Sequence, residues 1–78
     1  MTPEQFIPAV LAEIRAELGR QGVNVTRLSA VTGISQPSLS RKLRGESPLG
    51  LLDTLLICDA LHVTVPTLLG RASDMAAA

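Results

Sequence analysis

The 78-residue sequence contains no tryptophan and no tyrosine, and Phe6 is its single aromatic residue. Its hydrophobic content of 46% is therefore supplied mainly by Leu, Val, Ile and Ala, which predicts an aliphatic core. A chain of this length holds a single small domain or a fragment, because soluble domains usually contain about 100 to 200 residues. The lack of aromatic stacking platforms also argues against a protein that binds single-stranded nucleic acid.

Cysteine and histidine are almost as scarce, with Cys58 and His62 as the only residues of their kind. A disulfide needs a second cysteine and a structural zinc site needs about four Cys or His ligands, so we expect neither. Cys58 lies inside an apolar run, where a buried structural thiol is more common than a nucleophile. The sequence offers no other set of catalytic residues, so we expect no enzymatic activity, no cofactor and no bound metal.

Long apolar runs are absent as well. No stretch reaches the ~18 consecutive apolar residues of a membrane span, and the first residues lack the basic and then apolar order of a signal peptide. A lone cysteine also suits a reducing compartment. These features together predict a cytoplasmic protein without a membrane partner.

The formal net charge is zero, with seven basic and seven acidic side chains, which taken alone predicts no attraction to nucleic acid or to an anionic membrane. The charges are nevertheless unevenly distributed. Residues 20–45 carry five basic and no acidic side chains. Residues 1–19 carry three acidic and one basic, and residues 46–78 carry four acidic and one basic. The excess positive charge therefore falls on the middle of the chain.

Apolar residues recur at helical spacing along the chain, and no alternation of apolar and polar residues is long enough for a strand. Five short helices are predicted, at about residues 3–18, 25–32, 36–44, 49–62 and 65–70. Together they predict an all-α protein, a compact bundle that forms a single domain over residues 1–71. Residues 72–78, which end in three alanines, are expected to form a flexible C-terminal tail.

Capping residues define the expected helix ends. The N-cap candidates are Thr2, Asn24, Ser35, Ser47 and Thr64. Gly19 is a stop signal for the first helix, and Glu13 and Glu17 are expected on its polar side. Pro8 is expected either to kink that helix or to delay its start to about Ile7, because proline removes a backbone hydrogen bond.

The predicted helices at residues 25–32 and 36–44 are joined through Gly33, and the second of them is almost entirely polar. Two short helices joined in this way match the helix-turn-helix arrangement, in which the second helix lies in the major groove of DNA. Ser29 is small enough for a close approach of the two helices, and Ile34 fills the corner between them. The side chains left exposed on the second helix are Gln36, Pro37, Ser38, Ser40, Arg41 and Arg44, with Lys42 nearby. Glutamine can pair with adenine and arginine with guanine, so this helix is a candidate for reading DNA.

The stretch NVTRLSAVTGISQPSLSRKLRGE, followed by LLDTLLICDALHVTVPTLL, resembles the Cro and phage-repressor type (XRE-like) of helix-turn-helix domain, which has a lambda-repressor-like fold of five helices. The resemblance covers about residues 6–69. It implies a sequence-specific regulator of transcription that binds double-stranded DNA, such as a small phage or prophage Cro-like protein or repressor. It also implies occupation of a palindromic operator by a homodimer, one that is weak or forms with the help of DNA.

The same resemblance implies roles for individual residues of the helix-turn-helix. The residues that match base-contacting positions are Gln36, Pro37, Ser40 and Arg41. The residues that match positions near DNA phosphates are Asn24, Thr26, Ser38, Lys42 and Arg44. Two positions depart from the family pattern. Val25 stands where a phosphate-contacting glutamine is frequent, and Lys42 stands where an apolar residue is more usual.

These features also have simpler interpretations. The basic side chains within residues 41–44 could form an ordinary solvated helix face, but no acidic residue between Arg20 and Arg44 balances them, which favours DNA binding. The leucine-rich helix at 49–62 is apolar on almost every side, so it is either central to the core or shared with a second subunit. Its candidate dimer residues are Leu51, Leu55, Leu56 and Cys58. The alternative function is a protein-interaction module on the same fold, antitoxin-like or an adaptor, which would use this apolar helix.

Overall fold

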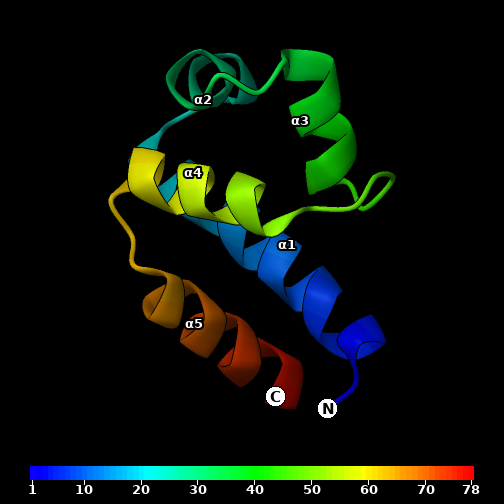
Figure 1. Cartoon of the computed structure of the whole chain (residues 1–78). Helices are drawn as coiled ribbons and strands as arrows, with labels where there is room; N and C mark the ends of the chain where they lie inside the picture. Colours follow the sequence, from blue (N-terminus) through cyan, green and yellow to red (C-terminus); the bar gives the residue numbers. More distant parts are fainter.

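The computed structural model describes residues 1–78, which form five α-helices and no strand. The helices are α1 (Pro3–Gln21), α2 (Val25–Thr32), α3 (Gln36–Leu43), α4 (Leu51–Leu61) and α5 (Val65–Ala77). The predicted all-α class is confirmed. In Figure 1, α2 and α3 lie at one end of the molecule and both chain termini lie at the other, where α5 packs against α1.

Side-chain caps explain where four of the five helices begin. Each cap residue has an oxygen that accepts a hydrogen bond from a backbone N–H of the first turn, which satisfies a donor that has no partner within the helix. The caps are Thr2 for α1, Asn24 for α2, Ser35 for α3 and Thr64 for α5, as predicted. The cap of α1 is reciprocal, because the N–H of Thr2 also donates to Oε1 of Gln5 at 2.9 Å.

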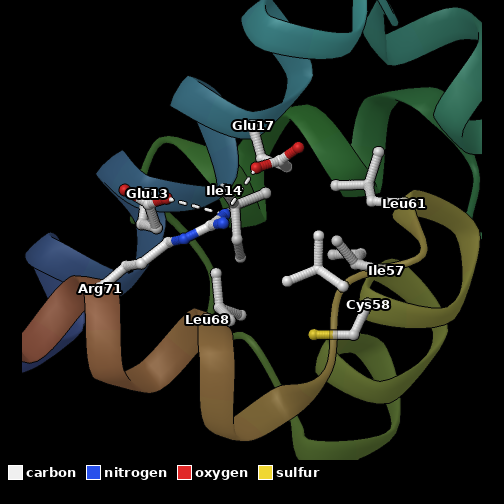
Figure 2. A pocket seen from close by; sticks show the side chains of 9 residues that line it. Glu13, Ile14, Glu17, Ile57, Cys58, Leu61, Leu68 and Arg71 are labelled. Carbon is white, nitrogen blue, oxygen red and sulfur yellow. Dashed lines mark hydrogen bonds and ion pairs between the residues drawn. The ribbon is translucent and has the colours of Figure 1, made fainter.

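The core is aliphatic, and every helix contributes to it. The side chains that are at most 3% exposed include one from each helix, namely Ile14, Leu28, Leu39, Ile57 and Leu68. Figure 2 shows the region between α1, α4 and α5, where Ile14, Ile57 and Leu68 point toward one another with Cys58 beside them. The void left there holds only about 10 Å³, room for no more than one water molecule. Close packing of aliphatic side chains thus replaces the aromatic residues that the chain lacks.

Helix α1 is longer than predicted. It begins at Pro3, as predicted, and it continues through Pro8, so the later start near Ile7 that Pro8 could have caused is not observed. Glu4 and Pro8 are both exposed, so water can bond the carbonyl oxygen of Glu4, for which Pro8 has no N–H. The helix also passes Gly19 and ends at Gly22, whose φ of 65° costs glycine little.

Helix α4 begins two residues later than predicted, and neither Ser47 nor Pro48 caps it. Its N-cap is Gly50, whose N–H donates to Oδ2 of Asp53 at 2.9 Å. The capping carboxylate therefore comes from inside the helix rather than from a residue before it. At its other end α4 is closed by His62, in a left-handed conformation with a φ of 56°.

The flexible tail predicted for residues 72–78 is not observed, because α5 continues past Gly70 to Ala77. Ala72 is completely buried and Ala76 is half-buried, at four-residue spacing from Leu68, which is also buried. These residues share one side of α5, and their small size lets the helix approach its neighbour closely. Burial of this alanine side extends the helix beyond the glycine that was expected to end it.

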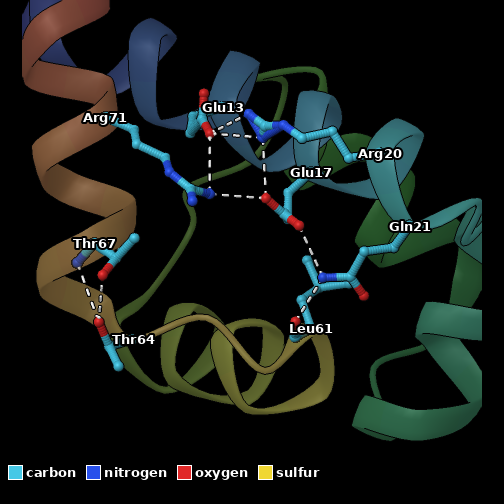
Figure 3. A network of polar contacts seen from close by, with 8 residues as sticks. All are labelled: Glu13, Glu17, Arg20, Gln21, Leu61, Thr64, Thr67 and Arg71. Carbon is cyan, nitrogen blue, oxygen red and sulfur yellow. Dashed lines mark hydrogen bonds and ion pairs between the residues drawn. The ribbon is translucent and has the colours of Figure 1, made fainter.

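A cluster of charged side chains joins α5 to α1 (Figure 3). Glu13 and Glu17 were expected on the polar side of the first helix, but they are only 4% and 8% exposed. Arg20 donates to both carboxylates. Nη1 of Arg71, from α5, lies 2.9 Å from Oε1 of Glu17. The two acidic residues are therefore buried as members of ion pairs, which offsets the cost of removing their charges from water.

Gln21 extends this cluster to α4. Its side-chain amide donates to Oε2 of Glu17 at 2.8 Å and to the carbonyl oxygen of Leu61 at 2.6 Å. The hydrogen bond from Gln21, followed by the Arg20 and Arg71 cations, holds the pKa of Glu17 below its usual value, although burial acts in the opposite direction. Polar contacts thus join α1, α4 and α5 in addition to their apolar packing.

No single helix is long and apolar enough to span a membrane. Only α4 and α5 taken together reach that length and apolarity, and they meet at a bend of 101°.

Candidate nucleic-acid interface

Hydrogen bonds fix the turn between α2 and α3. Gly33 ends α2 with a φ of 79°, a left-handed conformation that favours glycine, and its N–H donates to the carbonyl oxygen of Ser29 at 2.9 Å. The hydroxyl of Ser29 donates to the carbonyl oxygen of Ile34. The N–H of Ile34 in turn donates to the hydroxyl of Thr32 at 3.3 Å. Side chains as well as the turn itself therefore hold the angle between the two helices.

Two buried leucines decide which side of α3 faces outward. Leu39 and Leu43 are 0% and 3% exposed, and they pack in the same core cluster as Leu28 of α2. Because an α-helix turns once in about 3.6 residues, the remaining side of α3 must face the solvent. That side carries Gln36, Pro37, Ser40, Arg41 and Arg44, of which only Ser40 is partly buried. The structure thus brings the four predicted base-contacting residues onto one side of one helix, together with Arg44.

Two cationic side chains hold the C-terminal end of α3. Nη1 of Arg15, from α1, donates to the carbonyl oxygen of Leu43 at 2.5 Å, which satisfies an acceptor at the helix end. Nζ of Lys42 lies 2.9 Å from Oδ2 of Asp53 in α4. The hydrogen bonds from Lys42 and from the N–H of Gly50 hold the pKa of Asp53 below its usual value. Lys42 is therefore directed to α4 and is not brought together with the other predicted phosphate contacts.

Arg15 and Asp53 are missing from the site predicted from the sequence. Arg15 gives no sequence signal, because its partner is a backbone carbonyl 28 residues away. Asp53 does give one, since it lies three residues after Gly50, the spacing of a capping box. That spacing predicts the cap of α4 but not the second contact with Lys42.

Arg44 lies on the exposed side of α3 and pairs with Glu46. Nε of Arg44 lies 2.6 Å from Oε2 of Glu46, and both side chains are more than half exposed. The hydrogen bond and the charge of Arg44 hold the pKa of Glu46 below its usual value. An ion pair in contact with water contributes little to stability, so a phosphate can replace this carboxylate at small cost.

The other predicted phosphate contacts lie at helix N-termini. Asn24 and Thr26 are exposed at the start of α2, where Oδ1 of Asn24 accepts the N–H of Arg27 at 2.8 Å. Ser38 is partly buried in the first turn of α3. Helix N-termini suit anions, because their unpaired N–H groups and the helix dipole give them positive character. Val25 instead packs against the core, so it adds no polar group at this end of α2.

Ion pairs within the molecule neutralise much of the positive charge predicted for residues 20–45. The pairs are Arg20 with Glu13 and Glu17, Lys42 with Asp53, and Arg44 with Glu46. Arg27 and Arg41 are exposed and form no ion pair. These two arginines supply the free positive charge of the helix-turn-helix, and Arg27 was given no role in the predicted site.

The predicted dimer residues lie on two different sides of α4. Leu51 and Leu55 are 74% and 46% exposed, and Leu56 is partly buried. Cys58 is buried in the core, so it is not accessible to a second subunit. Its burial also raises the pKa of the thiol, because the charged form is poorly solvated there. Leu52, which the prediction omitted, is 70% exposed. We refer to Leu51, Leu52 and Leu55 as the α4 leucine surface.

An apolar groove of about 650 Å³ lies beside the α4 leucine surface. It is formed by α1, by the segment between α3 and α4, and by the starts of α4 and α5. Its apolar lining is Phe6, Ile7, Val10, Leu11, Leu49, Leu51, Val65 and Leu69. Lys42 of α3 also lines the groove. Contiguous apolar surface often marks a contact with another molecule, so this region is a candidate protein-contact site apart from the base-reading side of α3.

Comparison with known families agrees with this geometry. The family model of the Cro/C1-type HTH DNA-binding domain matches residues 13–74, which include the whole of α2, α3 and α4 and every predicted DNA contact. No curated protein and no solved structure matches the chain. The match covers most of the 78 residues and supports a regulator that binds double-stranded DNA. The chain therefore belongs to the Cro/C1-type family of helix-turn-helix DNA-binding domains.

Proposed function

We propose that the protein is a sequence-specific regulator of transcription that occupies operator DNA with α3 in the major groove. We assign it to the small phage or prophage repressors and Cro-like proteins, acting in the cytoplasm. The observation that carries the proposal is the two-sided character of α3. Leu39 and Leu43 lock one side into the core, while Gln36, Ser40 and Arg41 present polar groups on the other.

The exposed side of α3 offers the groups that distinguish base pairs in the major groove. The amide of Gln36 can donate to and accept from adenine, and the guanidinium of Arg41 can donate twice to guanine. The hydroxyl of Ser40 can bond to either, and Pro37 offers an apolar ring for the methyl group of thymine. Each good bidentate contact discriminates against a wrong base by about 1–3 kcal/mol.

Phosphate contacts would orient α3 in the groove. Asn24 and Thr26 at the start of α2, Ser38 near the start of α3 and Arg44 at its end flank the base-reading side. For each DNA phosphate that a cationic side chain neutralises, the logarithm of the binding constant falls by about 0.9 per log unit of salt concentration. A site with few free cations therefore predicts that DNA affinity depends only weakly on salt. Affinity then depends mainly on base contacts and on the pairing of two subunits.

We infer that the protein binds as a weak or DNA-assisted homodimer on a palindromic operator. Two recognition helices would then be ~34 Å apart, one turn of DNA. The α4 leucine surface supports this inference, because a two-fold interface buries the same patch of both subunits and three neighbouring leucines are exposed there. In sedimentation with and without duplex, L52K should reduce dimer formation. V31K, which changes an exposed apolar residue of α2 in the same way, should not.

Selection of duplexes from a random pool by the whole 78-residue chain tests the DNA-binding proposal for any operator sequence. The proposal predicts enrichment of one palindromic sequence family. R41A should lose the preference at one base position of each half-site. R27A removes the same charge from α2 and should leave the selected sequence unchanged. Enrichment that is absent at low salt, or that survives Q36A and R41A combined, would contradict the proposal.

A protein-interaction module, antitoxin-like or an adaptor, is the second candidate function. The α4 leucine surface and the groove beside it favour this function, because neither is needed to present α3 to DNA. Such a module predicts that no duplex is enriched. It also predicts that L52K, rather than Q36A or R41A, abolishes binding to the partner.

A further inference from the structure

The ion pair between Lys42 and Asp53 joins the end of α3 to the start of α4. Nζ of Lys42 lies 2.9 Å from Oδ2 of Asp53, and the same oxygen accepts the N–H of Gly50 at 2.9 Å. A Cβ at residue 50 would lie 3.3 Å from that oxygen, so glycine leaves room for the carboxylate. One carboxylate oxygen thus caps α4 and anchors the last turn of α3.

Both side chains of this pair are largely withdrawn from solvent, at 19% and 17% exposure. The neighbouring pair of Arg44 and Glu46 is different, since its side chains are 58% and 55% exposed. Water weakens an exposed pair, whereas removal of one partner from a partly buried pair leaves a charge that is poorly solvated. The Lys42 pair is therefore suited to hold a fixed geometry, and Arg44 is free to change partner.

The pair lies next to the base-reading side of α3. Lys42 directly follows Arg41, and on the α1 side Arg15 donates to the carbonyl oxygen of Leu43. The last turn of α3 is thereby held from α1 and from α4. Hydrogen bonds to base edges need donor and acceptor within about 2.7–3.2 Å, so a small rotation of this turn would displace Arg41 from its base.

We propose that Asp53 is a positioning residue for DNA recognition, which through Lys42 sets the orientation in which α3 presents Arg41 to the bases. The inference rests on the proposed function. It also assigns Lys42 to this pair rather than to a DNA phosphate, the role that the family resemblance implies. The pair acts on specificity, because it determines where a base contact falls, and it adds no DNA contact of its own.

Two variants that break the pair with opposite changes of charge test the proposal. D53N removes a negative charge but keeps an oxygen for the N–H of Gly50. K42M removes a positive charge but keeps a long side chain. Each variant is titrated with the duplex that wild type enriches and with a scrambled duplex of the same composition, and the ratio of the two affinities is measured. E46Q, which also removes a negative charge near α3, is the matched control for D53N.

The proposal predicts that D53N and K42M both lower this affinity ratio by about fivefold or more, since about fivefold is the smallest discrimination expected of one bidentate contact. The affinity ratio of the double variant should be no lower than that of either single variant, because each single variant already breaks the ion pair. E46Q should keep the wild-type ratio. Circular dichroism checks that each variant is folded. If K42M alone unfolds, the affinity ratios of D53N and of the double variant are compared with that of wild type instead.

Two results would overturn the positioning role. If only charge matters, D53N and E46Q will strengthen binding to both duplexes and K42M will weaken it, with the ratio unchanged throughout. If Lys42 contacts a phosphate, K42M will flatten the salt dependence by about 0.9 in log K per log unit of salt. Failure of the proposed function is recognised separately, because wild type would then enrich no duplex and both proposals would fall together.

Discussion

Arg71 of α5 and Glu17 of α1 are 54 residues apart in the sequence and 2.9 Å apart in space, measured from Nη1 to Oε1. Glu17 is 8% exposed and also receives hydrogen bonds from Arg20 and Gln21. The same helix α1 donates Arg15 to the end of α3. Ion pairs to the buried Glu17, distant from the candidate interface, therefore help to hold α1, which in turn contacts the end of α3.

This contact predicts that the protein loses stability in acid. The folded-state pKa values of Glu17 and Asp53 are lowered, so their contribution to stability is present above their unfolded-state pKa values, about 4.5 for Glu17 and 3.8 for Asp53, and is lost as pH falls through the folded values. Urea unfolding between pH 7 and pH 3 should show this loss. E17Q should be less stable by about 1–3 kcal/mol at pH 7 and should show a smaller decrease in acid.

E4Q is the control for that measurement, because Glu4 is exposed on the same helix. Glu4 is in the first turn of α1, where a negative charge is mildly favourable, so E4Q should lower stability at pH 7 by less than about 1 kcal/mol. Equal stability of E17Q and wild type at pH 7 would contradict the role assigned to Glu17.

The packing of α5 on α1 predicts that Ala72 tolerates no larger side chain. Ala72 is completely buried, and A72L would force extra methyl groups into a packed interface at a cost of about 1–3 kcal/mol. A77L makes the same change at an exposed position and should alter stability by less than about 0.5 kcal/mol. Thermal unfolding of the two variants measures the difference. Equal melting temperatures would mean that the end of α5 is not held against α1.

Two glycines should respond to alanine in opposite directions. Gly33 has a φ of 79°, so G33A should cost about 1–2 kcal/mol in backbone strain and disturb the helix-turn-helix. Gly19 lies inside α1, and a Cβ there would meet nothing within 4 Å, so G19A should add about 0.5–1 kcal/mol. The free energies of unfolding of G33A and G19A, measured with a chemical denaturant, test both predictions. A stabilising G33A would contradict the turn geometry.

Much of the fold could be predicted from the sequence because helix capping is local. The caps Thr2, Asn24, Ser35 and Thr64 each bond a residue within their own first turn, so residue type and spacing identify them. The start of α4 was predicted two residues too early because Ser47 and Pro48 resemble a cap and first turn, whereas Asp53 supplies the cap from inside the helix, at the spacing of a capping box. The length of α5 depends on burial of Ala72 against another helix, which no local pattern encodes.

The candidate interface, like the fold, could be predicted only where its features depend on residues close together in the sequence. The side of α3 that carries Gln36 and Arg41 follows from the spacing of Leu39 and Leu43, which is local. The charge available to DNA was overestimated, because the partner of Lys42 lies 11 residues further along the chain and across a turn. Summing charges along a segment cannot reveal which of them are already paired.

The location of the DNA contact on the protein tests the central claim most directly. Amide chemical shifts of the ¹⁵N-labelled chain are recorded during titration with the duplex that the protein enriches from a random pool. DNA recognition through α3 predicts that the largest shifts occur along α3 and at the start of α2, and that they saturate at one subunit per half-site. Shifts confined to the α4 leucine surface, or no shifts at all, would contradict DNA recognition through α3.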